Sequence, residues 1–146
     1  MSDHERPLNK RGRNAAPRIG RLLVDSGMVP DLMLCSTAQR ARETSDLVIS
    51  AAKCGEDTPI NYLDELYLAP PSAYYKMLNV HAGEADMVMV IGHNPGLENL
   101  IDELTNEPVT MPTAALARIE VESWQELVSQ PVGRLVGHWL VRDLEE

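Results

Sequence analysis

Two segments of the chain each run from a short apolar stretch directly into a helical pattern, and this repeated order constrains the fold more than any other feature. The segment DMVMVIG, residues 86–92, is typical of a strand, and PGLENLIDEL after it carries leucine and isoleucine at helical spacing. Earlier, PDLMLCS is typical of a short buried strand and leads into TAQRARETSDLVISAA, which has an apolar helical face. Strand-helix units in series favour an α/β domain with a mainly parallel sheet.

The remaining segments continue the alternation of helices and strands, and the last two segments depart from it. Residues 9–26 are expected to form a first helix, with Asn9 as its N-cap and Gly27 at its end. A short strand near 60–66 and a helix over about 71–80 follow, the helix entered through Pro-Pro-Ser. The closing segments TAALARIEVE and GRLVGHWLV are rich in β-forming residues and predict two late antiparallel strands.

Size, charge and cysteine content exclude several classes of protein. A chain of 146 residues with 44% hydrophobic residues fits one domain, 1–146. Its net charge of -9 argues against nucleic acid or an anionic membrane as a partner. No apolar run reaches the roughly 20 residues of a membrane helix and no secretory signal is present, so a cytoplasmic protein is expected. Cys35 and Cys54 lack metal or disulfide spacing and are interpreted as buried or incidental thiols.

Unusual polar residues follow the two clearest strands, where ligands collect in open parallel sheets. His93 follows one strand in the sequence Gly-His-Asn-Pro-Gly, and Asn94 is expected to cap the next helix. Arg40 lies in the first turn of the other helix, after Ser36 and Thr37, which are expected to cap that helix or bind the ligand. A helix N-terminus, a histidine and an arginine suit a phosphate. The alternatives are a packed histidine and a surface arginine.

Together the motifs resemble those of the histidine phosphatase superfamily, in particular the small SixA-type phosphohistidine phosphatases. The similarity runs nearly end to end, through SDHERPLNKRGRNAA, PDLMLCSTAQRARET, LDELYLA, VIGHNPGLENL, PTAALA and VRDL. The resemblance implies a single-domain, three-layer α/β sandwich like that of phosphoglycerate mutase. It also implies a phosphoryl group carried on a histidine and clamped by arginines and a second histidine, with no metal or cofactor.

Site residues follow from the resemblance position by position. His93 matches the second histidine and Arg40 a phosphate-binding arginine. Ser36 and Asn94, which lie at the same two strand ends, are further candidate phosphate contacts from their positions in the sequence. Glu65 in LDELYLA lies near the position where some members of the superfamily place a proton-donating acid, although a surface carboxylate is the alternative.

The largest departure from the family is the absence of its opening strand and Arg-His motif, which supply the nucleophile. No Arg-His pair occurs in the sequence, and His4 matches the loop downstream of that motif. His81 and His138 lie in no motif and are interpreted as structural or exposed. The family strand is central, so its neighbours are expected to face a gap of unpaired backbone groups that weakens or rearranges the fold. We expect Met1 to be an internal start or the edge of a cropped sequence, rather than the beginning of a degenerate protein.

Two functional hypotheses remain open. The first is a phosphohistidine or phosphomonoester phosphatase that turns over in a full-length form, while these 146 residues have little or no turnover. Its partner would be a phosphorylated protein or a small phosphomonoester. The second is a pseudophosphatase that binds a phosphorylated ligand without chemistry. An unrelated nucleotide-binding domain is disfavoured because no Gly-rich phosphate loop is present.

Overall fold

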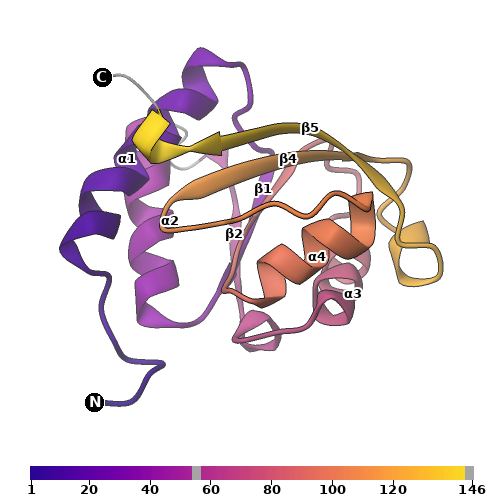
Figure 1. The fold of residues 1–146 in the computed structure, drawn as a ribbon, viewed down its shortest axis with the longest axis horizontal. Coiled ribbons are helices and arrows are strands. Elements are labelled where there is room, and N and C mark those ends of the chain that lie inside the picture. The colour runs from indigo at the N-terminus through magenta and orange to yellow at the C-terminus, as the bar shows by residue number, and fades with distance from the viewer. Residues whose placement is uncertain (54–56, 144–146) are drawn as a thin grey trace.

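The computed structural model describes residues 1–53 and 57–143, and Cys54 lies outside these residues. Figure 1 shows the described elements, which in chain order are α1 (Lys10–Asp25), β1 (Leu32–Ser36), α2 (Gln39–Ala52), β2 (Ile60–Leu63), η2 (Asp64–Leu66), α3 (Pro71–His81), β3 (Val88–Ile91), α4 (Gly96–Thr105), β4 (Ala115–Val121), η3 (Glu126–Val128), β5 (Gly133–Leu140) and η4 (Val141–Asp143). The strands and helices predicted from the sequence are therefore all present.

Helix α1 begins and ends where the sequence predicts. The Asn9 side chain accepts a hydrogen bond from the backbone N–H of Gly12 at 2.9 Å, so Asn9 is the N-cap. Ser26 is the C-cap, and Gly27 follows in the left-handed region with φ of 65°. In the middle of the helix, a Cβ added at Gly20 would lie 2.5 Å from the carbonyl oxygen of Val48 in α2. Gly20 therefore allows α1 and α2 to pack closely.

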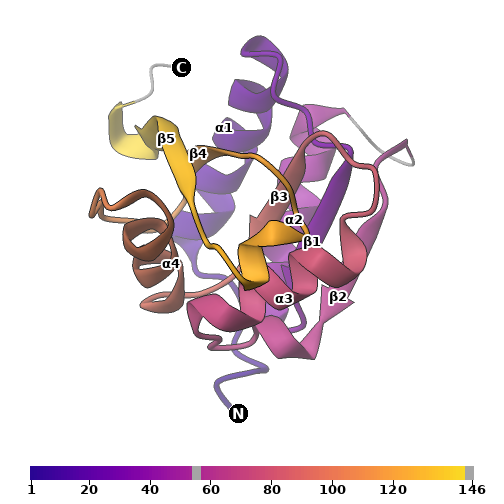
Figure 2. The same ribbon diagram turned by 90° about the vertical axis from the view of Figure 1, so that its right-hand side faces the viewer.

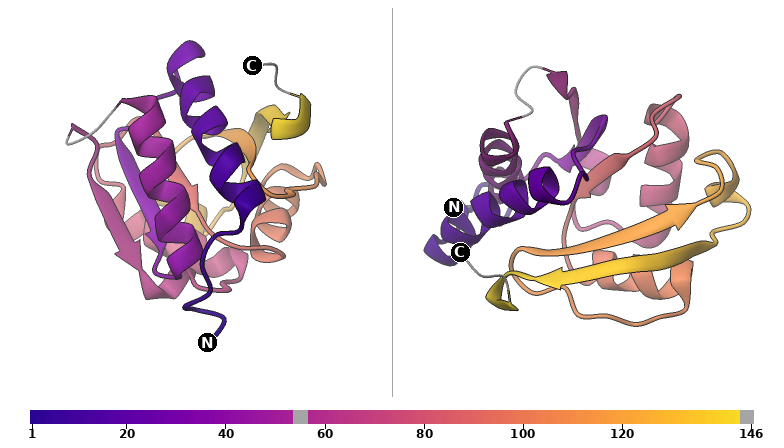
Figure 3. Two further views of the ribbon diagram at one scale, coloured as in Figure 1. Left: turned by 90° about the vertical axis from the view of Figure 1, so that its left-hand side faces the viewer. Right: turned by 90° about the horizontal axis from the view of Figure 1, so that it is seen from above.

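The central layer contains a parallel sheet with the strand order β2-β1-β3. Strand β1 is buried along its whole length, as the middle strand of a sheet covered on both faces should be. In β3 the side chains alternate: Met89 packs into the cluster with α1, whereas Val88 and Val90 pack into the cluster with α3 and α4. Figure 2 shows α3 and α4 on one side of the sheet, and the left view of Figure 3 shows α1 and α2 on the other. The predicted three-layer α/β sandwich is confirmed.

Strands β4 and β5 form a separate antiparallel pair, with a register irregularity between Arg118 and Ile119. The amide of Asn94, just after β3, donates to the carbonyl of Met111, just before β4. At the other end, the indole of Trp124 donates to the carbonyl of Ala85, just before β3. Strand β4 therefore runs opposite to β3, although within the described residues no strand pairs with both.

The sheet is thus interrupted between β3 and β4, where the resemblance predicts a missing central strand. Both strands line a cavity of about 1080 Å³ at this break. The right-hand view of Figure 3 shows the β4-β5 pair set apart from the parallel strands. In the ranges 1–53 and 57–143, no helix is long and apolar enough to cross a membrane.

Candidate functional site

The carboxyl edge of the parallel sheet brings together the residues that follow β1 and β3. Ser36 is the last residue of β1, and His93 lies two residues after β3. One ring nitrogen of His93, Nε2, lies 2.7 Å from Ser36 Oγ, and the other, Nδ1, lies 3.3 Å from a guanidinium nitrogen of Arg40. Arg40 reaches this edge from the first turn of α2, as predicted. The structure therefore brings Arg40, His93 and Ser36 into direct contact.

The contacts of His93 determine which of its ring nitrogens carries the proton. A guanidinium can only donate, so Nδ1 accepts from Arg40 and Nε2–H donates to Ser36. The side chain is 8% exposed. Burial, and next the positive charge of Arg40, lower the pKa of His93 from 6.5 to about 4. His93 is therefore neutral at pH 7.

Arg40 is already engaged by a carboxylate from the N-terminal segment. Its guanidinium donates to the backbone carbonyl of Asp3 at 2.8 Å and to Asp3 Oδ2 at 3.2 Å. The Tyr67 hydroxyl donates to the same carboxylate and, with the Arg40 charge, keeps the pKa of Asp3 below its usual value. The Arg40 guanidinium thus holds a carboxylate, which is a small anion, at this edge of the sheet. The Arg40 side chain is 19% exposed and the Asp3 side chain is 46% exposed, so solvent reaches this ion pair from the Asp3 side.

A second group of polar side chains surrounds this pair. His4 Nε2 lies 2.9 Å from Thr37 Oγ1, and the Thr37 hydroxyl donates to Asp64 Oδ1 at 2.5 Å. The ring of Tyr67 makes edge contacts with both His4 and His93, at centroid distances of 4.8 and 5.5 Å. Residues from the N-terminal segment, β1, η2 and the turn after β3 therefore converge at one edge.

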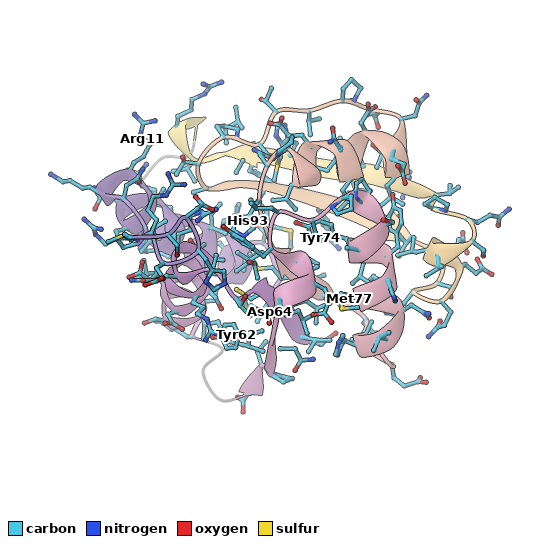
Figure 4. The ribbon with its side chains drawn as sticks, turned by 90° about the horizontal axis from the view of Figure 1, so that it is seen from below. Arg11, Tyr62, Asp64, Tyr74, Met77 and His93 are labelled. Carbon is cyan, nitrogen blue, oxygen red and sulfur yellow. The ribbon has the colours of Figure 1, made fainter. Side chains whose placement is uncertain are left out.

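The backbone beside His93 is fixed from the α3 side. The backbone N–H of His93 donates to the hydroxyl of Tyr74 at 3.4 Å, and Tyr74 is fully buried. A Cβ added at Gly92 would lie 2.0 Å from that hydroxyl, so only glycine fits there. Figure 4 shows His93 and Tyr74 close together, with Asp64 nearby. The glycine of the Gly-His-Asn-Pro-Gly motif thus permits the close approach that orients His93.

Glu65 and Asn94 are not brought into this cluster. Glu65 is exposed in η2 and lines a separate surface hollow with Ser72 and Lys76. Asn94 is exposed and donates through its amide to the carbonyl of Met111 at 2.6 Å. The prediction that Asn94 caps α4 is wrong, because the cap residue is Pro95 and no side chain bonds the helix N-terminus.

The capping prediction for the helix after β1 also needs correction. The N-cap of α2 is Ala38, without a side-chain cap. Ser36 Oγ instead accepts the backbone N–H of Ala38 at 3.2 Å and the ring N–H of His93. Thr37 turns toward His4 and Asp64. Both hydroxyls hold side chains at the edge, and neither caps a helix.

Reasoning from the sequence did not find Asp3, His4, Asp64, Tyr67 and Tyr74. The segment SDHERPL carries several polar residues, but no periodic pattern connects it to the strand ends it contacts. The other histidines lie elsewhere: His81 Nδ1 is 3.5 Å from the Asn61 amide, and His138 bonds the carbonyl of Thr110. Within the described ranges, no group of three His, Cys, Asp or Glu is placed to hold a metal ion.

Comparisons with known proteins agree with this fold. No family model matches the sequence. The chain is 32% identical over 139 residues to an uncharacterized protein of Mycobacterium tuberculosis, covering 95% of this chain and 82% of the relative. A similar protein of Mycobacterium leprae is 28% identical over 138 residues.

Solved structures give the family. A proposed phosphohistidine phosphatase SixA from Agrobacterium tumefaciens superposes with a TM-score of 0.78 at 30% identity, over 96% of this chain and 87% of that protein. A SixA protein from Nakamurella multipartitia has a TM-score of 0.80 at 25% identity, over 96% and 87% of the two chains. The structure of the protein histidine phosphatase SixA with tungstate shares the fold, with a TM-score of 0.80 at 23% identity, over 99% and 90% of the two chains. On the strength of this identity and coverage, the chain belongs to the SixA phosphohistidine phosphatases of the histidine phosphatase superfamily.

Proposed function

We propose that this domain is part of a phosphohistidine or phosphomonoester phosphatase whose reaction passes through a phosphorylated histidine. The observation that supports the proposal is the direct contact between Arg40 and His93 at the edge where β1 and β3 end. In this proposal the substrate is a phosphorylated protein or a small phosphomonoester. The printed 146 residues contain no Arg-His pair, so we expect them to bind the anion with little or no turnover.

Arg40 and His93 have different parts in this proposal. The planar guanidinium of Arg40 matches two phosphate oxygens once Asp3 moves away from it. His93 Nδ1 has no proton in the neutral ring, so it donates to the anion only after taking one up. The negative charge of a phosphate would favour that uptake, while Ser36 keeps the other nitrogen oriented. Positioning and charge neutralisation are the main contributions of a protein to phosphoryl transfer.

A pseudophosphatase is the second candidate, favoured by the same Arg40–His93 contact in a sequence without an Arg-His pair. Such a protein would bind a phosphorylated ligand and perform no reaction. The two candidates differ in turnover and share anion binding.

The first experiment compares hydrolysis of a phosphohistidine protein and a generic phosphomonoester by this chain and by a version carrying an added N-terminal strand with an Arg-His motif. Activity only in the extended version, lost in Arg40→Ala and His93→Ala, supports the phosphatase. Arg11→Ala removes one exposed positive charge on α1 and is the matched control. Anion binding without turnover in both versions favours the pseudophosphatase, and turnover by the short chain contradicts our account of the nucleophile.

Phosphate binding by the short chain can be measured separately by calorimetry. Arg40→Ala should weaken binding by about tenfold or more, because a charged hydrogen bond to the anion is lost. Asp3→Asn should strengthen binding roughly threefold to tenfold, because a competing negative charge leaves Arg40. Glu5→Gln, in the same exposed segment, is the control for a general change in charge. Equal effects of the Asp3 and Glu5 substitutions would contradict direct competition at Arg40.

A further inference from the structure

Helix α1 carries a strip of positive charge on a protein that is otherwise acidic. Five of the 13 Lys and Arg residues lie in α1, whose only acidic residue is Asp25 at its end, whereas the whole chain has 22 Asp and Glu residues. Lys10, Arg13 and Arg21 are exposed on the side of α1 opposite its buried residues. At 3.6 residues per turn they lie within about 80° of one another round the helix, and Arg11 lies outside this strip, about 100° from Lys10. We call Lys10, Arg13 and Arg21 the basic face of α1.

The charges of the basic face are placed against the electrostatics of the helix. The first turn of α1 contains basic residues and no acidic residue, and the last turn contains no basic residue. Because a helix N-terminus carries a partial positive charge, anions are favourable there and cations are not. Within the described ranges, no ion pair joins the basic face to a carboxylate, and Arg13 bonds only the backbone carbonyl of Leu8. These charges therefore do not stabilise α1, and their side chains are available to another molecule.

The basic face begins near the Arg40 site. Asp3, which bonds Arg40, and Lys10 are seven positions apart, so at most about 25 Å of extended chain separates them. The backbone N–H of Leu8 donates to Glu43 Oε1 of α2 at 2.7 Å. The start of α1 therefore lies beside the first two turns of α2, which include Arg40. The left view of Figure 3 shows α1 beside α2 on the outside of the molecule, with its first turn toward the N-terminus.

The charge pattern favours a protein with a local acidic patch over an extended polyanion. At physiological salt, exposed charges more than about 8 Å apart are largely screened, so a partner responds to the charges nearest to it. A folded protein with a row of carboxylates about 16 Å long would meet only the basic face, whose first and last residues are that far apart along the helix. A nucleic acid or an anionic membrane would extend over the acidic remainder of the surface and be repelled there.

We propose that the basic face of α1 docks an acidic patch of the phosphorylated protein whose phosphoryl group reaches Arg40. The substrate is then a phosphoprotein with carboxylates on the surface beside its phosphorylated side chain. Charge complementarity would speed the encounter and orient the substrate, while Arg40 and His93 hold the phosphoryl group. Naming the docked protein a substrate rests on the proposed function, whereas the docking itself requires no turnover.

The first measurement is fluorescence anisotropy of the full chain with two labelled peptides, Glu-Ala-Ala-Glu repeated four times and Gln-Ala-Ala-Gln repeated four times. Each peptide has as many residues as α1, which has 16. At about 50 mM salt the glutamate peptide should bind at least about tenfold more tightly than the glutamine peptide. Its affinity should fall several-fold at about 200 mM salt, because exposed charges are screened. Inorganic phosphate should displace it no more than sodium chloride of equal ionic strength, because the peptide does not occupy the Arg40 site.

Charge substitutions locate the docking face. Lys10→Glu combined with Arg21→Glu should weaken binding of the glutamate peptide at least about tenfold. Lys76→Glu combined with Arg118→Glu makes the same change of net charge on α3 and β4, and should alter binding by less than about twofold. The first double variant should keep or raise the melting temperature, because Lys10→Glu places a carboxylate in the first turn of α1. In the natural chain, the amide chemical shifts that change on adding the peptide should concentrate in α1.

Turnover separates this proposal from the proposed function. In the version with the added Arg-His strand, Lys10→Glu combined with Arg21→Glu should raise KM several-fold for a phosphoprotein with an acidic surface. The same variant should leave hydrolysis of a small phosphomonoester unchanged. No turnover in the extended version, with peptide binding intact, would count against the phosphatase and not against the docking.

Several outcomes would overturn the docking proposal. These are equal binding of the two peptides or binding of neither, equal loss in the two double variants, displacement by phosphate, and peptide-dependent shifts outside α1. Tighter binding of a short DNA duplex or of phosphatidylglycerol vesicles would assign the basic face to a different partner. Self-association in sedimentation that Lys10→Glu combined with Arg21→Glu abolishes would assign it to a second copy of the chain.

Discussion

At the scale of single residues, the protonation state of His93 follows from its burial and from two contacts. Burial and the Arg40 charge lower its pKa to about 4, and the Arg40 and Ser36 contacts leave the proton on Nε2. A neutral histidine between a hydroxyl and a guanidinium is held in one orientation at pH 7. The same guanidinium nitrogen of Arg40 contacts His93 Nδ1 and the carboxylate of Asp3.

The same pKa shift makes stability depend on pH in a defined window. Between pH 6.5 and 4 the unfolded chain binds a proton at this histidine and the folded chain does not, so the free energy of unfolding decreases as pH falls. The contribution is complete above about pH 6.5 and its loss reaches at most about 3 kcal/mol near pH 4. Urea denaturation at several pH values should show this slope in the natural chain and a smaller one in His93→Gln.

His138→Gln is the control, because that ring lies on β5 and bonds Thr110. A slope that is unchanged in His93→Gln would contradict the pKa assigned to His93. The comparison uses the change of the free energy of unfolding with pH rather than its absolute value. The stability lost with the Ser36 contact in His93→Gln therefore does not affect the result.

At the scale of elements, the packing of α1 on α2 depends on a glycine with no room for a side chain. Gly20 and Gly12 both lie inside α1, and alanine would raise the helix propensity of each by about 1 kcal/mol. At Gly20 the new Cβ would meet the backbone of α2, at 2.5 Å from the Val48 carbonyl. At Gly12 it would meet only the flexible end of Leu8, at 2.4 Å.

Gly20→Ala should therefore lower the free energy of unfolding by about 1–3 kcal/mol, because the two helices must move apart. Gly12→Ala should be close to neutral or stabilising, because Leu8 can rotate away. Both values can be measured by urea denaturation. A stability loss of similar size in the two variants would show that the closeness of α1 and α2 is not the cause.

At the scale of the whole molecule, the interrupted sheet divides the fold into two parts whose backbone amides differ in their protection from hydrogen exchange. Strand β1 is buried at every residue between β2 and β3, whereas β4 has partly and fully exposed residues and one paired neighbour. Local opening requires little loss of apolar contact where one edge of a strand is free. The β4-β5 pair should therefore open without the parallel sheet.

Amide hydrogen exchange tests this division. The amides of β1 should exchange only through global unfolding, and those of β4 should exchange at least about tenfold faster through local opening. Low concentrations of urea, which destabilise the whole protein, should accelerate amide exchange in β1 and leave amide exchange in β4 nearly unchanged. Equal rates in β1 and β4, with the same urea dependence, would mean that the two parts unfold together.

Much of this protein can be predicted from its sequence by itself. The alternation of apolar runs with helical patterns determined the elements and the α/β class, because periodicity and capping residues such as Asn9 act over a few neighbouring residues. The positions of Ser36, Arg40 and His93 at the ends of two strands were predictable for a related reason, since parallel strands end at a common edge. The resemblance also predicted the break in the sheet.

Only the tertiary structure decided what surrounds those residues. Asp3 reaches Arg40 across 37 positions of sequence, and Tyr67 joins His4 to His93, through contacts that no local pattern encodes. Asn94 was predicted to cap a helix, yet its amide binds the carbonyl of Met111, because a partner distant in sequence was within reach. Local patterns specify elements and their ends, whereas side-chain partners at an edge depend on how separate elements pack.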